Sequence, residues 1–336
     1  MNHIISFIKD GNDPSIDFVK GLCIIFVIIT HVITPVMNKY SLFCLWGEMA
    51  VPVFLMIQVF HAYKKGMSDI KIGWVKLFWR IVWPFVLAQV CALLLLFVMG
   101  QNLSVLNEFG NLGPGAYYPY IYFQFVVLLY ILSPIFYKVR NIGHLLILFI
   151  FISEALELIC IYSQIEPSIY RLLAFRYFFL IFLGFLMSKD KLVLNTKTVI
   201  LAFFSVLFIV DVKYTGGDKY DGILYMSSWK TFHWMSYFYV AYLLIFMMKW
   251  LYNCLPKENV LSVYLQRCGK CSYEIFLFQM VFLLFSPVNI IFSKYIGNNI
   301  ISESLSALLN VIVCTYPVIA FKKVSVKNAA LCNSNK

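Results

Sequence analysis

The feature that most constrains this chain is a series of apolar runs, each about twenty residues long, separated by short polar breaks. A helix needs about 20 residues to cross the hydrocarbon layer of a bilayer, because each residue advances about 1.5 Å along its axis. Hydrophobic residues make up 62% of the chain and charged residues 13%, which is more apolar surface than a soluble protein of 336 residues can bury. The sequence therefore predicts an all-α, polytopic membrane protein. It excludes a disordered chain, a secreted disulfide scaffold and a nucleic-acid-binding domain.

The runs predict about ten transmembrane helices that form a single domain over residues 1–336. Most Lys and Arg residues outside the runs fall in the even-numbered loops and the C-terminal tail, and few fall in the odd-numbered loops. Because cytoplasmic loops carry the excess of basic residues, we expect both termini in the cytoplasm. Most of the net charge of +11 then reflects topology. The predicted helices lie at about 16–36, 42–62, 74–98, 119–137, 144–163, 170–187, 198–213, 231–249, 272–292 and 301–321.

Ionisable residues inside the predicted helices are the candidates for function, because each costs several kcal/mol in hydrocarbon unless it is paired or faces water. The first helix carries Lys20 near its cytoplasmic end and His31 beyond its middle. At about 100° per residue the two side chains share one face, at depths about 16 Å apart. His31 is a candidate proton-transfer group or a residue bonded within the helix bundle. Lys20 is a candidate ligand-binding residue or one that extends to the interface.

Glu48 is the candidate partner of His31. It begins the second predicted helix on the outer side. If the first two helices form a hairpin, Glu48 and His31 lie at similar depth, and the carboxylate could orient the imidazole as the acid does in a catalytic triad. The alternative is an interfacial residue that faces outer water.

Two basic residues, Lys76 and Arg80, lie on one face at the cytoplasmic start of the third predicted helix. With Lys20 they could form a basic cluster at the inner surface. Such a cluster suits a phosphorylated ligand, because Arg binds phosphate with two hydrogen bonds and Lys supplies a point charge. The alternative is the ordinary basic flank of a membrane helix.

A second polar group is expected toward the outer half of the membrane. Glu154 and Glu157 lie in the fifth predicted helix, and Arg171 and Arg176 begin the sixth. They could form a buried network of ion pairs or a pocket for a sugar or another hydroxylic acceptor. Gln279, in the ninth helix, could bond a ligand or a neighbouring helix. The sequence holds no metal-ligand cluster, no Gly-rich phosphate loop and no covalent carrier site.

The order of several segments resembles acyltransferase family 3, the integral-membrane enzymes that O-acylate bacterial surface polysaccharides and related glycans. Two departures stand out, since Lys76 replaces the usual Arg and Gln279 stands where many members have His. The second departure removes a possible proton-transfer group and leaves more of the chemistry to His31. The matching segments are Ile16–Gly21 followed by His31, Ala50–Leu55, Arg80–Phe85, Phe175–Gly184 and Gly269–Leu277.

The resemblance implies an acyl-CoA donor, most often acetyl-CoA, on the cytoplasmic side of a bacterial inner membrane. It implies a hydroxyl acceptor on a surface polysaccharide or its lipid-linked precursor, and contact with membrane lipid. His31 would be the general base, with Glu48 orienting it. The donor would contact Lys20, Lys76 and Arg80, and the acceptor Glu154, Glu157, Arg171, Arg176 and Gln279. The alternative function is a transporter or flippase of a glycan or lipid intermediate that uses the same charges without acyl transfer.

Overall fold

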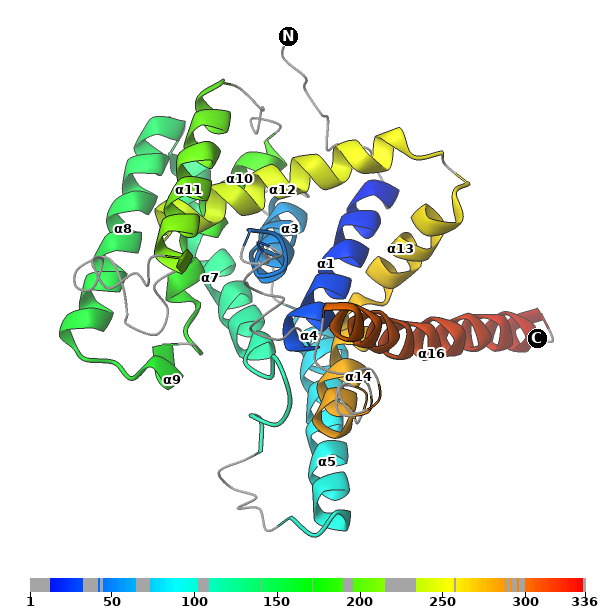
Figure 1. Cartoon of the computed structure of the whole chain (residues 1–336). Helices are drawn as coiled ribbons and strands as arrows, with labels where there is room; N and C mark the ends of the chain where they lie inside the picture. Colours follow the sequence, from blue (N-terminus) through cyan, green and yellow to red (C-terminus); the bar gives the residue numbers. More distant parts are fainter. Residues whose placement is uncertain are drawn as a thin grey trace. The chain divides into compact units, whose positions relative to one another are not determined.

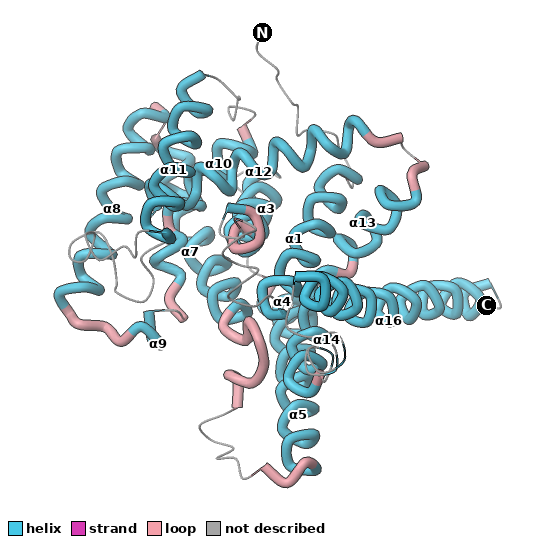
Figure 2. Tube along the Cα trace, in the orientation of Figure 1, coloured by secondary structure: helices cyan, strands magenta, loops and turns pink. Residues whose placement is uncertain are grey.

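In its described part the computed structural model of the chain is helical, with loops between the helices (Figure 2). The prediction of an all-α protein is confirmed for the described part of the chain, which contains no strand. By their internal contacts the residues form two compact units. The first is Met1–Asp13, Cys44–Arg80 and Tyr117–Met247, and the second is Pro14–Phe43, Ile81–Ala116 and Met248–Lys336. The structure describes residues 13–32, 42, 45–64, 73–101, 109–139, 141–170, 172–189, 196–214, 234–256, 258–286, 288, 291, 295 and 300–334.

The first unit is held together by the packing of α3 on α10. Gly184 of α10 lies so close to Val59 and to the carbonyl of Met56 that an added Cβ would collide with both. The Tyr63 hydroxyl of α3 donates to the carbonyl of Leu129 in α7 at 3.2 Å. The helices of this unit are α3 (Ala50–Lys64), α4 (Trp74–Leu77), α7 (Tyr118–Lys138), α8 (Ile142–Tyr162), α9 (Pro167–Tyr170), the 3₁₀ helix η4 (Ala174–Tyr177), α10 (Phe179–Ser188), α11 (Thr196–Tyr214) and the first part of α12 (Trp234–Cys254).

The second unit is built around α1 and α13, which pack side by side (Figure 1). Their backbones approach at two glycines. A Cβ on Gly21 would collide with the carbonyl of Leu265, and one on Gly269 would collide with the carbonyl of Asp17. Helix α14 contacts α1, α5 and α16. The helices of this unit are α1 (Pro14–Val32), α5 (Trp83–Val98), α13 (Val260–Lys270), α14 (Ser272–Phe285) and α16 (Ile300–Ser334), with the last residues of α12.

Several helices have the length and composition of membrane spans, as expected for a multi-pass membrane protein. Among the described residues, five helices are long and apolar enough to cross a membrane, and α13 with α14 would make a sixth if this bent pair is one span. The number ten and the position of the termini stay predictions. The five helices are Pro14–Val32, Trp74–Val98, Tyr118–Phe136, Ile142–Cys160 and Ile300–Lys322.

The predicted helix at 170–187 is broken into α9, η4 and α10. Gln124 of α7 explains the break. Its Nε2 donates to the carbonyl of Leu172 at 2.6 Å, and its Oε1 accepts from the N–H of Ala174 at 2.9 Å. Leu173 between them is extended, with φ −88° and ψ 136°. A side chain from another helix therefore replaces the backbone bonds that a continuous helix would make.

The predicted helix at 74–98 matches the observed bounds but contains a π-helical turn, η3 (Phe78–Val82). Pro84 has no N–H to donate, and its ring crowds the carbonyl of Arg80, so a regular helix is disfavoured here. The Tyr273 hydroxyl donates to the carbonyl of Ile81 at 2.6 Å. The turn alters the regular spacing that places Lys76 and Arg80 on one face.

A short helix, α13, was not among the predicted elements. It precedes α14, and the two helices are bent by 79°. Its apolar residues are interrupted by Ser262, Gln266 and Arg267, so no long apolar run marks it in the sequence. Asn259 caps its first turn by accepting from the N–H of Leu261 at 2.9 Å.

Candidate functional site

His31 lies at the end of α1, where its side chain is partly exposed. Two residues of the second unit lie beside it. A Cβ atom placed on Gly115 would be 3.4 Å from Nε2 of His31 and 3.1 Å from Cε2 of Phe276. The imidazole therefore borders the segment Phe109–Ala116 and helix α14. A Cβ at residue 115 would be in van der Waals contact with the ring nitrogen.

Lys20 lies on the same helix as His31 and is paired. Its Nζ is 2.6 Å from Oδ1 of Asp17, one turn earlier, and both side chains are largely buried. A buried ammonium needs such a partner, because an isolated charge would be costly there. Any anionic ligand at Lys20 would have to share this ammonium with Asp17.

Gln279 lies on α14 in the same unit as His31 and is fully buried, with 0% of its surface exposed. Its Nε2 donates to the carbonyl of Pro114 at 3.2 Å. Its Oε1 has no hydrogen-bond partner within the described residues. The structure thus associates Gln279 with the segment beside His31.

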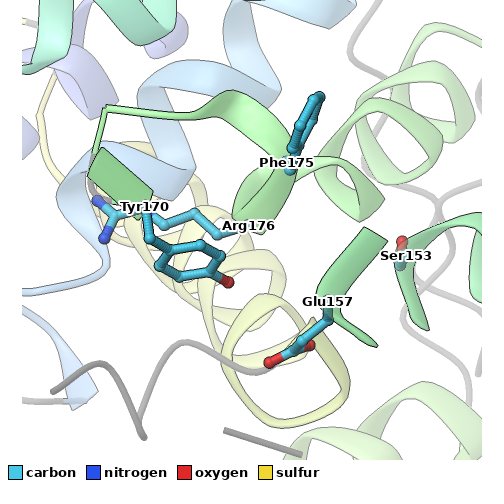
Figure 3. Close-up of a pocket in the computed structure, with 5 residues that line it drawn as sticks. All are labelled: Ser153, Glu157, Tyr170, Phe175 and Arg176. Carbon is cyan, nitrogen blue, oxygen red and sulfur yellow. The ribbon is translucent and has the colours of Figure 1, made fainter. Parts of the chain in front are cut away.

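A small polar pocket lies within the first unit; its enclosed part is about large enough for one water molecule, and the roughly 230 Å³ of space between its walls includes open solvent. Its walls combine two aromatic rings with a carboxylate, a guanidinium and a hydroxyl (Figure 3). In Figure 3 the Tyr170 hydroxyl is directed to the side that carries Glu157, whereas the Arg176 guanidinium points away from it. The Ser153 hydroxyl is buried without a hydrogen-bond partner in the described part of the chain. The lining residues are Ser153, Glu157, Tyr170, Phe175 and Arg176.

Arg176 is only 4% exposed and is held by aromatic neighbours. Its guanidinium lies 4.4 Å from the ring centroid of Tyr177 and 5.6 Å from that of Tyr117. Its Nη2 donates to the Tyr177 hydroxyl at 2.6 Å. The Glu48 carboxylate is close enough to Tyr177 to interact with it electrostatically. A buried cation is therefore fixed beside the pocket by two rings and a hydroxyl.

The comparison with protein families decides the class of the chain. The model of acyltransferase family 3, described as an acyltransferase domain, matches residues 13–320, which is nearly the whole chain. The chain belongs to this family. No match was found among curated proteins or among solved structures.

Some of the residues that the sequence singled out for this acyltransferase lie together in one unit, and others belong to different units. Glu157 and Arg176 line one pocket, and Glu154 is a partly exposed neighbour on α8. Their role in binding an acceptor stays a prediction. Arg171 lies outside the described residues. Glu48 belongs to the first unit and His31 to the second, so their pairing stays a prediction.

The residues proposed to bind the donor also belong to different units. Lys76 and Arg80 are exposed residues of the first unit, and Lys20 belongs to the second. The basic cluster that the sequence predicts from these three residues stays a prediction.

The sequence did not single out some of the polar residues of this acyltransferase. Ser153 precedes Glu157 by one helical turn, so a small polar residue in an apolar run was a signal for it. Gln89 is fully buried in α5, with 0% of its surface exposed, and its only signal was an amide inside an apolar helix. Tyr170 and Tyr177 gave no signal in a chain that contains 22 Tyr residues.

Proposed function

We propose that this protein is an O-acetyltransferase of the bacterial inner membrane, with acetyl-CoA as donor and a cell-surface polysaccharide or its lipid-linked precursor as acceptor. Its membership of acyltransferase family 3 supports acyl transfer. The assignment of the base rests on His31, a partly exposed imidazole at the end of a membrane helix, whose Nε2 lies beside Gly115. An imidazole nitrogen can accept a proton from a bound hydroxyl.

His31 would act first as base and then as acid. Its Nε2 removes the proton of the acceptor hydroxyl as the oxygen attacks the thioester carbonyl. The C–S bond of the tetrahedral intermediate then breaks, and the CoA sulfur leaves with the proton from the imidazolium. The products are an O-acetyl ester and free CoA, and the base is regenerated. Glu48 is proposed to orient the imidazole and to stabilise its protonated form.

The donor is proposed to bind at the cytoplasmic side through Lys20, Lys76 and Arg80. The side chains of Lys76 and Arg80 are exposed, so a CoA phosphate can reach them. Lys20 lies on the same helix as His31, at a depth that differs by about 16 Å in an α-helix. An extended pantetheine arm can span such a distance while the nucleotide stays at the surface.

The acceptor is proposed to bind in the pocket of the first unit. Aromatic faces such as those of Tyr170 and Phe175 stack on sugar rings, and Glu157 and Ser153 can hydrogen-bond sugar hydroxyls. Arg176 would contact a ring oxygen, a carboxylate or a phosphate of the acceptor. Glu154, Arg171 and Gln279 complete the proposed acceptor residues.

The mass of the surface glycans tests this function. We expect disruption of the gene to remove the mass of one acetyl group per repeating unit, and expression of the intact protein to restore it. A glycan that is made and exported but keeps its acetyl groups would contradict the proposal. A transporter or flippase predicts a different result, because loss of transport would lower the amount of exported glycan and leave its acetylation unchanged.

A further inference from the structure

We propose that Gly115 sets the space beside Nε2 of His31 and limits the transferred acyl group to a short one, an inference that rests on the proposed acyl transfer. The segment Phe109–Ala116 passes beside the imidazole at Gly115. Gly115 has a φ of +82°, a conformation that favours glycine. The backbone conformation favours a glycine here, and an added Cβ would be in tight contact with Phe276.

The segment is held by Gln89 of α5, which uses both ends of its amide. Its Nε2 donates to the carbonyl of Leu112 at 2.8 Å, and its Oε1 accepts from the N–H groups of Gly110 and Leu112 at 3.0 Å each. The amide is fully buried, so no bulk water competes for these bonds. A side chain with three buried backbone partners fixes the position of the loop.

Helix α14 holds the same segment from its other end. Gln279 donates to the carbonyl of Pro114, and Gly113 lies so close to the backbone of Met280 that an added Cβ would collide with it. The backbone on the N-terminal side of Gly115 is thus tied to two helices. It has little freedom to move away from a group that enters beside His31.

The reaction needs room for two substrates close to Nε2 of His31. A hydroxyl oxygen must come within about 2.6–3.2 Å of the base, and the acyl carbon within about 3–3.5 Å of that oxygen. A methyl group on residue 115 would stand 3.4 Å from Nε2 and so would occupy part of this space. The ring of Phe276 limits the same space, since it lies 3.1 Å from the same Cβ position. An acetyl group suits such a site better than a longer chain.

Gln279 supplies a second, independent sign that a ligand belongs here. It follows Phe276 by nearly one turn on α14, so the two side chains lie on one face of the helix. Its Oε1 is buried and has no partner among the described residues. An unsatisfied buried acceptor is costly, and a ligand hydroxyl could donate to it.

Two substitutions, Gly115→Ala and Phe276→Leu, test the inference. Each is measured with purified protein in lipid nanodiscs, supplied with an extract of the unacetylated glycan and with acetyl-CoA or butyryl-CoA. We expect Gly115→Ala to lower kcat for acetyl transfer about tenfold or more. Gly100→Ala is the matched control, because Gly100 has a similar φ of +75° but an added Cβ there would meet no atom of the described residues within 4 Å. Gly100→Ala should stay within about twofold of the wild type, since it carries the backbone strain without the contact.

Phe276→Leu provides a gain of function that general damage to the fold would not produce. We expect it to raise the ratio of butyryl to acetyl transfer, measured as kcat/KM, by about tenfold. Diethyl pyrocarbonate labelling of His31, followed by mass spectrometry, measures access to the imidazole without requiring turnover. Labelling should be slower in Gly115→Ala than in Gly100→Ala.

Each outcome decides between this inference and the proposed function. The inference is wrong, and the function stands, if the wild type transfers acetyl groups but Gly115→Ala and Phe276→Leu keep its ratio of butyryl to acetyl transfer and its labelling rate. Equal loss of activity in Gly115→Ala and Gly100→Ala would also overturn it, because strain alone would then explain the loss. If the wild type transfers no acyl group, the proposed function is wrong and the inference falls with it.

Discussion

Arg176 donates from Nη2 to the hydroxyl of Tyr177, its neighbour in the chain, at 2.6 Å, and its guanidinium lies over the ring of the same residue. A short 3₁₀ helix makes this possible by directing both side chains into the interior of the first unit. The hydroxyl and the ring together stabilise a buried positive charge beside a pocket that also contains a carboxylate. The pair therefore serves both the stability of the unit and the electrostatics of the pocket.

Tyr177→Phe should destabilise the protein, because it keeps the ring and removes the hydroxyl that accepts from Arg176. A hydrogen bond to a charged group contributes about 1.5–3 kcal/mol, so we expect a lower midpoint of thermal unfolding in detergent. Tyr130→Phe is the control, because Tyr130 is 51% exposed. Equal midpoints for the two variants would show that the bond contributes nothing measurable.

Glu157→Gln should weaken acceptor binding, because the amide changes the hydrogen bonds that the carboxyl group can make with sugar hydroxyls. We expect KM for the acceptor to rise about tenfold, which corresponds to about 1.4 kcal/mol, with little change in KM for acetyl-CoA. Glu166→Gln removes an exposed carboxylate nearby in the chain and is the control. A rise confined to KM for acetyl-CoA would place Glu157 outside the acceptor site.

Arg80→Ala should weaken donor binding, because it removes a guanidinium that can contact a CoA phosphate. KM for acetyl-CoA should rise more than KM for the acceptor, and the difference should shrink at high ionic strength. Lys138→Ala, which removes another exposed cation of the first unit, serves as the control. The reverse pattern of KM values would exclude Arg80 from the donor site.

Gln89→Leu should lower stability, because it leaves two N–H groups and one carbonyl of the Phe109–Ala116 segment without their buried partner. Each unsatisfied group costs about 1–3 kcal/mol, so the unfolding midpoint should fall clearly. Gln101→Leu makes the same change at an exposed position. If both variants unfold at the same temperature, Gln89 does not hold the segment.

The long apolar helices were predictable, because their length is set by the bilayer and appears directly in the sequence. The bounds of α7 and α8 agree with the predicted helices within two residues at each end. The break between α9 and η4 was not predictable, since it depends on Gln124, which lies about 50 residues earlier in the chain. The role of Gln89 was not predictable either, because its partners lie beyond the end of its own helix.

The residues of the candidate site could also be predicted only in part from the sequence. His31 and Arg176 could be selected because charged or titratable groups in apolar runs are rare and costly. Neither Gly115 beside His31 nor the two tyrosine rings around Arg176 could be selected. Glycine and tyrosine are ordinary residues in this sequence, and only the three-dimensional path of the chain gives these particular ones a role.

Acetyl transfer by the His31→Ala variant is the most direct test of the account. Wild-type protein, His31→Ala and the control His144→Ala, which replaces an exposed histidine, would be reconstituted with acetyl-CoA and acceptor glycan. The measurement is the rate of CoA release together with the acetyl ester formed. We predict that kcat falls about a hundredfold or more in His31→Ala, while the variant stays folded in the membrane, and that His144→Ala matches the wild type. Wild-type rates of acetyl transfer in His31→Ala would contradict the assignment of His31 as the base.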